Sequence, residues 1–266
     1  MSAYVSHAFA KLGARVKIEL LELPAGVSGR GSVELDIRQD LKGEYFLIRK
    51  TQTASVEILQ SQPRNRHLLL LTRVPSDAVG QQKSRFLMGH DERHWFVAAI
   101  PESTPVSTVD AARQALKPSA VAGRETGLRA KRKHARSNKA WVRQGEWFFV
   151  PAPDMQVKPF LILKHEPVRR GGGKPHLCDE LYREGGELVY VSRQNPNGLT
   201  EDEYRNLDER IRSSQIWRTM RRNPRVLVRG KVRHPDHATI VLDGWHELHM
   251  NTETRALAMQ QVAFLD

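Results

Sequence analysis

The sequence predicts a β-rich α+β protein with two mainly antiparallel sheet domains, two helices and a basic linker. Apolar and polar residues alternate in many short segments separated by Gly, Pro, Asn and Asp, which is typical of strands joined by hairpin turns. Only two segments combine helical spacing of apolar residues with helix start and stop signals. Strands and helices do not alternate regularly, so a parallel doubly wound sheet is not expected.

Strand-like segments dominate the first part of the chain. An opening strand at 16–23 is followed by a glycine-rich loop at 24–32, whose spacing does not match a phosphate-binding loop. Residues 33–50 form two strands around a polar turn. Two more strand pairs are expected, at 55–60 with 67–73 and at 85–89 with 95–100.

Each of the two predicted helices has recognisable ends. The first covers 103–117 and stops at Pro118. The second and longer helix begins at Thr200, which forms a capping box with Glu203, and it ends before Pro224. The apolar stripe of this longer helix consists of Tyr204, Leu207, Ile211, Trp217 and Met220.

A change in composition at 119–140 divides the chain. This stretch has few large apolar residues and a run of cations between Arg129 and Lys139, so we expect an exposed basic linker. The linker separates an N-terminal β-rich domain, 1–118, from a C-terminal α+β domain, 141–266. In the C-terminal domain we expect strand 226–233, turn 234–237, strand 239–242, turn 243–244, strand 245–250 and a terminal strand at 256–266.

Four histidines at 234–249 are candidate catalytic or metal-binding residues. They form two pairs with the same spacing, H-x2-H: His234 with His237, and His246 with His249. Neutral imidazoles that converge from neighbouring strand ends bind zinc or a similar divalent ion, or act as an acid and a base near neutral pH. We therefore predict His234, His237 and His246 as catalytic residues, with a divalent metal as the candidate cofactor.

The histidines also have a plainer interpretation. Residues three apart on a strand point to opposite faces, so His246 and His249 share one site only if the strand bends. In this plainer interpretation the histidines lie in turns, on the surface or against phosphate. In the catalytic interpretation, Asp236 or Asp243 assists the reaction.

The charge balance indicates a polyanionic partner. Lys and Arg outnumber Asp and Glu by 42 to 30, which gives a formal charge of +12 at pH 7. A protein this basic most often binds nucleic acid, although a generally basic proteome or a merely solvated linker would also explain the charge. The predicted phosphate contacts come from the basic linker, a glycine-rich segment at 168–176 and the strands near 221–233. They are Arg129, Lys131, Arg132, Lys133, Arg136, Lys139, Arg143, Arg169, Arg170, Lys174, Arg221, Arg222, Arg229, Lys231 and Arg233.

Three functional hypotheses follow. The first is a nucleic-acid-binding protein that contacts the backbone of RNA or single-stranded DNA, because no recognition-helix motif stands out while Trp and His lie beside basic residues. The alternative is a histidine-dependent or metal-dependent nuclease or phosphodiesterase. The third is an assembly protein whose basic face binds an acidic protein partner, as in a nucleoprotein complex.

Cysteine content and apolar runs limit the other classes. A single cysteine, Cys178, excludes an internal disulfide framework and a Cys-based zinc finger, and it fits a reducing cytoplasm. Cys178 lies close to His176 and two carboxylates; a nucleophile with its base is one interpretation, and a buried structural cysteine is favoured. No apolar run is long enough to cross a bilayer, and the first residues lack the pattern of a secretory signal.

Overall fold

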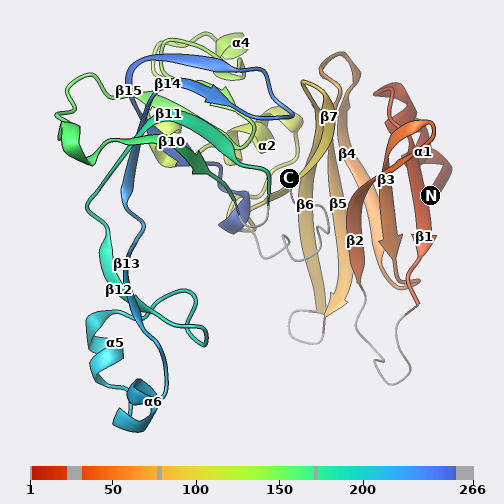
Figure 1. The fold of residues 1–266 in the computed structure, drawn as a ribbon. Coiled ribbons are helices and arrows are strands. Elements are labelled where there is room, and N and C mark those ends of the chain that lie inside the picture. The colour runs from red at the N-terminus through yellow and green to blue at the C-terminus, as the bar shows by residue number, and fades with distance from the viewer. Residues whose placement is uncertain (1, 23–31, 77–79, 171–172, 256–266) are drawn as a thin grey trace.

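The computed structural model describes residues 2–22, 32–76, 80–170 and 173–255. Two sheet-containing halves lie side by side, and a thin arm extends from the C-terminal half (Figure 1). The chain is mainly β-sheet with few helices, and almost all strand pairs are antiparallel, which confirms the expected β-rich α+β class. None of the helices in the described residues is both long enough and apolar enough to span a membrane.

The N-terminal half contains two sheets. A three-stranded sheet of order β1-β3-β2 follows an N-terminal helix, and a four-stranded antiparallel sheet has the order β4-β5-β6-β7. The strand pairs expected at 33–50, 55–73 and 85–100 are all present. The elements are α1 (Ser2–Lys11), β1 (Val16–Leu20), β2 (Val33–Asp40), β3 (Gly43–Lys50), β4 (Ser55–Gln62), η1 (Pro63–Asn65), β5 (His67–Ser76), β6 (Gly80–Asp91) and β7 (His94–Ile100).

The four-stranded sheet is buried on both faces. Leu68 and Leu70 of β5 pack into the core shared with the first sheet, whereas Leu69 packs on the other face. That other face is covered by α2 (Val109–Ala115), which is shorter than the predicted helix and begins where the Thr108 side chain accepts a hydrogen bond from the Ala111 amide. Each fully buried leucine stabilises the fold by about 2 kcal/mol. This sheet is therefore a rigid support for the turns at the ends of its strands.

The stretch 119–140 is folded rather than an exposed linker. It contains α3 (Ser119–Ala122) and α4 (Ala130–Lys133), and Val121 is fully buried. Lys117 forms a buried ion pair with Glu125 and donates a further hydrogen bond to the Lys133 carbonyl. These contacts anchor the stretch to Lys117, which follows α2, so composition alone was a poor guide to its exposure.

The C-terminal half is built on a six-stranded antiparallel sheet of order β10-β11-β14-β15-β9-β8. Its core includes Phe149, Leu181 and Val228. The return strand continues through the expected turn at 243–244, where Gly244 adopts a φ of 93°. The elements are β8 (Val142–Gln144), β9 (Trp147–Pro151), η2 (Pro159–Leu161), β10 (Leu163–Val168), β11 (His176–Glu184), β14 (Arg225–Arg233), β15 (Ile240–Met250) and η3 (Glu253–Arg255).

The arm replaces the long helix expected after Thr200, and that prediction is wrong. The predicted capping box is present and starts α5 (Glu201–Arg205), but Asp208 caps a second short helix, α6 (Glu209–Ser213). The remaining residues form β13 (Arg218–Arg222), which pairs with β12 (Glu187–Val191). Pairing with a distant strand outweighs the local helical pattern. The terminal strand expected at 256–266 lies outside the described residues.

Candidate active site: a three-histidine cluster beside an interface cavity

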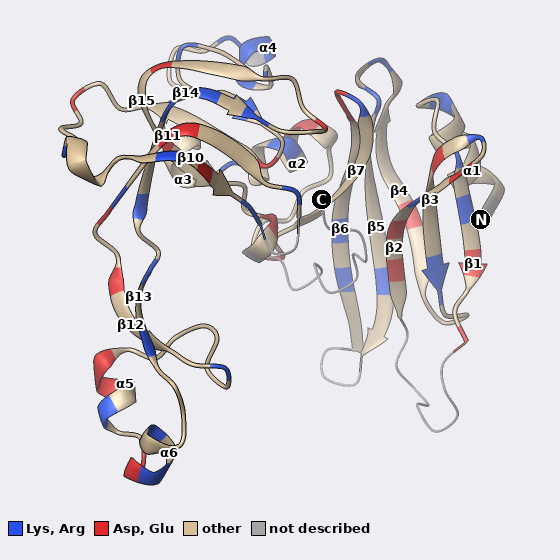
Figure 2. Cartoon of the chain, in the orientation of Figure 1, with Lys and Arg blue, Asp and Glu red and all other residues tan. Residues whose placement is uncertain are grey.

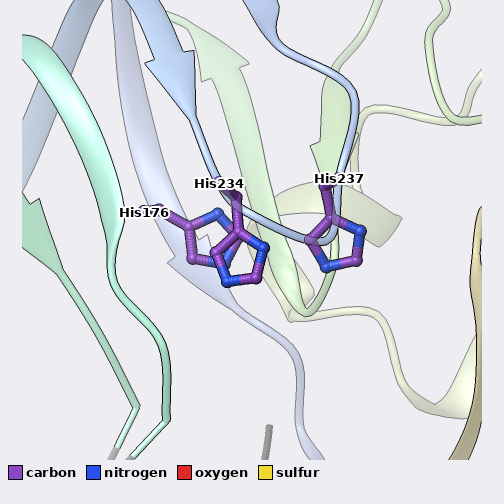
Figure 3. A group of neighbouring side chains, drawn as sticks. All are labelled: His176, His234 and His237. Carbon is purple, nitrogen blue, oxygen red and sulfur yellow. The ribbon is translucent and has the colours of Figure 1, made fainter.

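Three histidine side chains meet at one end of the six-stranded sheet (Figure 3). His176 opens β11, His234 directly follows β14, and His237 lies in the loop before β15. Antiparallel pairing of β11 with β14 sets Leu177 opposite Arg233, which brings His176 beside His234. One nitrogen from each ring lies within 4.8 Å of the other two, and the ring centroids are 4.3, 4.7 and 5.8 Å apart. These residues are called the three-histidine cluster.

The turn between β6 and β7 holds the histidine loop from the N-terminal half. Arg93 Nη1 donates to the Pro235 carbonyl over 3.4 Å, and the Ala238 amide donates to Glu92 Oε2 over 2.6 Å. His94 Nε2 lies 3.8 Å from Asp236 Oδ1. The position of the cluster therefore depends on contacts between the two halves as well as on the sheet that carries it.

Gln144 fixes the tautomer of His176. The Gln144 amide nitrogen donates to the carbonyls of Val232 and Ala238, so its oxygen remains as the acceptor. His176 Nδ1 lies 2.9 Å from that oxygen and must therefore carry the proton. The lone pair of His176 is consequently on Nε2, which lies 3.8 Å from Glu146 Oε2.

His237 has a similar orientation. Its Nδ1 is buried without a hydrogen-bond partner and lies 3.6 Å from the Glu92 carboxylate. The other nitrogen, Nε2, faces Gly145, where a Cβ atom would come within 2.8 Å of it. A carboxylate near Nδ1 favours the proton on that atom, so the lone pair on Nε2 faces the β8–β9 turn.

His234 differs from its two neighbours. Its Nδ1 accepts a hydrogen bond of 3.1 Å from the Asp236 amide, which puts the proton of the neutral ring on Nε2. Burial, then the neighbouring His237, lowers the pKa of His234. Burial, followed by the charges of His234 and His237, lowers the pKa of His176 to about 3. Both rings are therefore neutral at neutral pH.

The structure brings together only part of the predicted set. His246 pairs with Val228 inside the sheet, six residues along β14 from His234, which in a strand is roughly 20 Å. Its ring nitrogen Nδ1 contacts the Gly244 carbonyl, while His249 lies 3.4 Å from Glu247. The assignment of His246 to the site with His234 and His237 is therefore corrected: its place is taken by His176.

Neither assisting carboxylate takes the predicted part. Asp236 binds Lys174 over 2.8 Å, and exposed Asp243 lies within β15. The carboxylates nearest the cluster are instead Glu92 and Glu146. Both belong to hairpin turns. In the sequence, each was recognisable only as a charged residue in a turn that precedes a Trp-containing strand.

An interface cavity of about 320 Å³ adjoins the cluster. Asp91 and Trp95 line it from β6 and β7, and Arg113 lines it from α2. Gly145 and His237 line it from the C-terminal half, so that the cluster has one member in the cavity wall. The volume lies within the range of small-ligand pockets.

Carboxylates pair most of the cations in this cavity. Arg136 and Arg143 both contact Asp91, and Arg170 contacts Glu253. Burial alone would raise the pKa of Asp91, but the charges of Arg143 and Arg136 outweigh it and lower that pKa. The paired groups form a fixed polar wall.

Besides Lys133 of α4, Arg113 is the exception among the lining cations. It donates to the His134 carbonyl over 2.8 Å, and within the described part of the chain it has no carboxylate within salt-bridge distance. Burial, followed by the charge of Arg143, lowers its pKa. A half-buried cation that faces a cavity and has no carboxylate within salt-bridge distance is suited to an anionic ligand.

The predicted phosphate contacts divide into three groups. Seven of the fifteen are in ion pairs: Arg136, Arg143, Arg170, Lys174, Arg222, Arg229 and Arg233. Arg169, Lys231 and Arg221 are exposed and apart from the cavity, and Arg221 donates to the Gly186 carbonyl. The expected continuous basic surface is thus interrupted by carboxylates along the sheet and the arm (Figure 2).

The remaining cations lie in and around α4, whose ribbon carries the blue of Lys and Arg in Figure 2. No ion pair involves them among the residues that the structure describes. Lys133 also lines the interface cavity, so this surface reaches the cavity directly. These residues are called the α4 cations: Arg129, Lys131, Arg132, Lys133 and Lys139.

Cys178 is a structural residue. It is fully buried in the core of the six-stranded sheet, and its thiol contacts the His176 carbonyl rather than the ring. Burial raises the pKa of the thiol to about 12, so it stays protonated at neutral pH and is no nucleophile.

Comparison of the chain with models of known families, with curated proteins and with solved structures gives no match. The chemistry of the three-histidine cluster and the interface cavity is therefore the basis for assigning function.

Proposed function

We propose that the protein is a phosphodiesterase that cleaves nucleic acid at the three-histidine cluster. The observation that carries the proposal is one of placement: unpaired cations at α4 lead to a cavity that has His237 in its wall. Cations of this kind bind phosphates without reading sequence. Imidazoles beside such a phosphate supply either proton transfer or metal coordination.

The dimensions of the cavity favour single strands or chain ends. A volume of about 320 Å³ accommodates a nucleotide-sized group and is too small for a duplex. Arg113 would hold a phosphate inside the cavity, while the exposed α4 cations would hold the chain outside it. This division of labour supports RNA or single-stranded DNA as the substrate.

Binding without cleavage is the second candidate. It is supported by the α4 cations themselves, which suffice for contact with a phosphate backbone. It leaves unexplained why three imidazoles are clustered beside the cavity. Cleavage accounts for both features, and we therefore prefer it.

The test uses the full chain with end-labelled RNA, single-stranded DNA and duplex DNA of one sequence. We expect cleavage of a single-stranded substrate on denaturing gels. Binding should weaken steeply between about 50 and about 200 mM salt, because phosphate contacts release counter-ions. Replacing two α4 cations, Lys131→Glu with Arg132→Glu, should weaken binding by about tenfold or more.

A matched control makes the same change of charge on the arm, with Arg193→Glu and Arg210→Glu. Both control residues are exposed and belong to the segment between β12 and β13. The control should keep its affinity within about threefold. Equal losses in the two variants would contradict the role of α4. Binding without cleavage of any substrate would overturn the enzymatic proposal and leave the second candidate.

A further inference from the structure

We propose that His176, His234 and His237 form a binding site for one divalent transition-metal ion such as zinc. The inference deepens the proposed function, because it names the cofactor of the same site. It also stands separately, since metal binding is measured without any substrate.

The first argument is convergence. The three rings come from two segments that are far apart in sequence, and one nitrogen of each lies within 4.8 Å of the others. In a loaded tetrahedral site, nitrogens bonded at about 2.0–2.1 Å lie about 3.3 Å apart. The cluster is thus slightly open, and a small rotation of the rings closes it around an ion.

The second argument is the orientation of two of the rings. His176 is held by Gln144, which is 1% exposed. The side-chain amide of Gln144 donates both of its hydrogen atoms to backbone carbonyls. His237 has a carboxylate, Glu92, close to its own Nδ1. In both residues Nδ1 faces a supporting acceptor, and Nε2 is left with its lone pair. Metal-binding histidines are typically oriented by such partners.

The third argument concerns the close approach of the β8–β9 turn to the rings on the cavity side. Gly145 has a φ of 57° and no side chain, and a Cβ atom there would collide with His237 Nε2. Glu146 follows, with its carboxylate 3.8 Å from His176 Nε2. An ion held by three imidazoles would keep its fourth position on this side for water, next to a carboxylate that can accept a proton.

His234 is the ligand that has to adjust. Its Nδ1 accepts the Asp236 amide, so binding of an ion exchanges that hydrogen bond for a metal–nitrogen bond. One neutral hydrogen bond is weak beside coordination of a divalent ion. We therefore expect His234 to contribute less to affinity than His176 or His237.

The experiment titrates metal-free full-length chain with Co²⁺ and Zn²⁺. We expect about one ion per chain by elemental analysis, and visible absorption of bound Co²⁺ that marks a four-coordinate site rich in nitrogen. Replacement by alanine at His237, whose side chain is 13% exposed, should lower the affinity for Zn²⁺ by about a hundredfold or more. His249→Ala is the matched control, since it removes a histidine outside the cluster and should leave the affinity within about twofold.

The outcomes are separable. A metal-free chain that takes up no Co²⁺ overturns the site even if no variant folds, because the native chain alone answers that question. Equal losses from His237→Ala and His249→Ala also overturn it. A chain that binds metal but cleaves nothing keeps the metal site and removes the proposed function. Cleavage that survives complete removal of metal keeps the proposed function and shows that the metal is not its cofactor.

Discussion

The two histidine pairs of the C-terminal half have the same spacing in sequence but lie on backbone of different conformation. His234 and His237 lie in a loop, and their ring centroids are 4.7 Å apart. His246 and His249 lie within β15, where residues three apart face opposite sides of the sheet. Only the loop pair joins the three-histidine cluster. Spacing in sequence therefore acquires meaning only with the backbone conformation that carries it.

The largest difference between the two pairs is expected in catalysis. His237→Ala should reduce the rate of nucleic-acid cleavage by about a hundredfold or more, because it removes a cluster member from the cavity wall. His249→Ala should keep the rate within about twofold. Initial rates on a labelled single strand, with thermal melting to confirm folding, measure both. A slower His249→Ala enzyme of native stability would mean that the strand pair belongs to the site.

The support behind the loop pair offers a smaller effect. Gln144→Leu removes the partner of His176 Nδ1 and should lower Zn²⁺ affinity by about 10-fold to 100-fold. Gln60→Leu is the control, since Gln60 accepts a hydrogen bond from the Val109 amide at the start of α2, away from the cluster. Calorimetric titration compares the two variants. If both lose affinity equally, the effect is general destabilisation and Gln144 has no positioning role.

Two glycines sharpen the comparison further. Gly145 and Gly244 both have positive φ, at 57° and 93°, but an added Cβ at Gly244 meets nothing within 4 Å. Alanine at either position should cost about 1–2 kcal/mol of unfolding free energy. Only Gly145→Ala crowds His237, and it should weaken Zn²⁺ binding by about tenfold. Unchanged affinity in a folded Gly145→Ala chain would show that the turn does not shape the site.

The smallest effect concerns two histidines that belong to neither pair. Burial first, and nearby arginine charge, lowers the pKa of His67 and of His134 from 6.5 to about 4. As the pH falls, the unfolded chain therefore binds protons at these two histidines before the folded chain does. The contribution of these two histidines to the free energy of unfolding should be constant above about pH 7 and fall by about 2–3 kcal/mol between about pH 6.5 and 4, allowing for partial exposure.

Urea unfolding at several pH values measures this decline. In the double variant His67→Gln with His134→Gln, the decline over the same range should be shallower, because these two groups no longer titrate. An identical slope in the variant and the native chain would assign the acid sensitivity to other groups.

The strands of the N-terminal half were readable from sequence because their determinants are local. Alternation in 33–50 reports one buried face directly, and short turns fix the partner. The stretch 200–222 misled because Tyr204, Leu207 and Trp217 satisfy helical spacing while they pack around two short helices and a hairpin. Trp217 meets the Tyr204 ring at 5.0 Å by folding back rather than along one helix. Pairing of β12 with β13 is a tertiary preference that no local window contains.

Only part of the candidate site could be predicted from sequence, because only part of it depends on local residues. His234 and His237 are neighbours in a loop that Pro235 made recognisable. His176 is 58 residues before His234, and the two meet only because the register of β11 against β14 places Leu177 opposite Arg233. Register depends on which faces are buried across the whole sheet. The signal available in sequence was the histidine next to Cys178, whose burial was correctly expected.

The interface cavity has a consequence for cohesion. Its walls belong to β7 on one side and to the β8–β9 turn on the other, so the space exists only while both halves stay in contact. An occupant that touches both walls is released when they part, and it therefore resists their separation. In the proposed function, a substrate that bridged the two walls would therefore stabilise the contact between the halves, and that contact would hold the substrate.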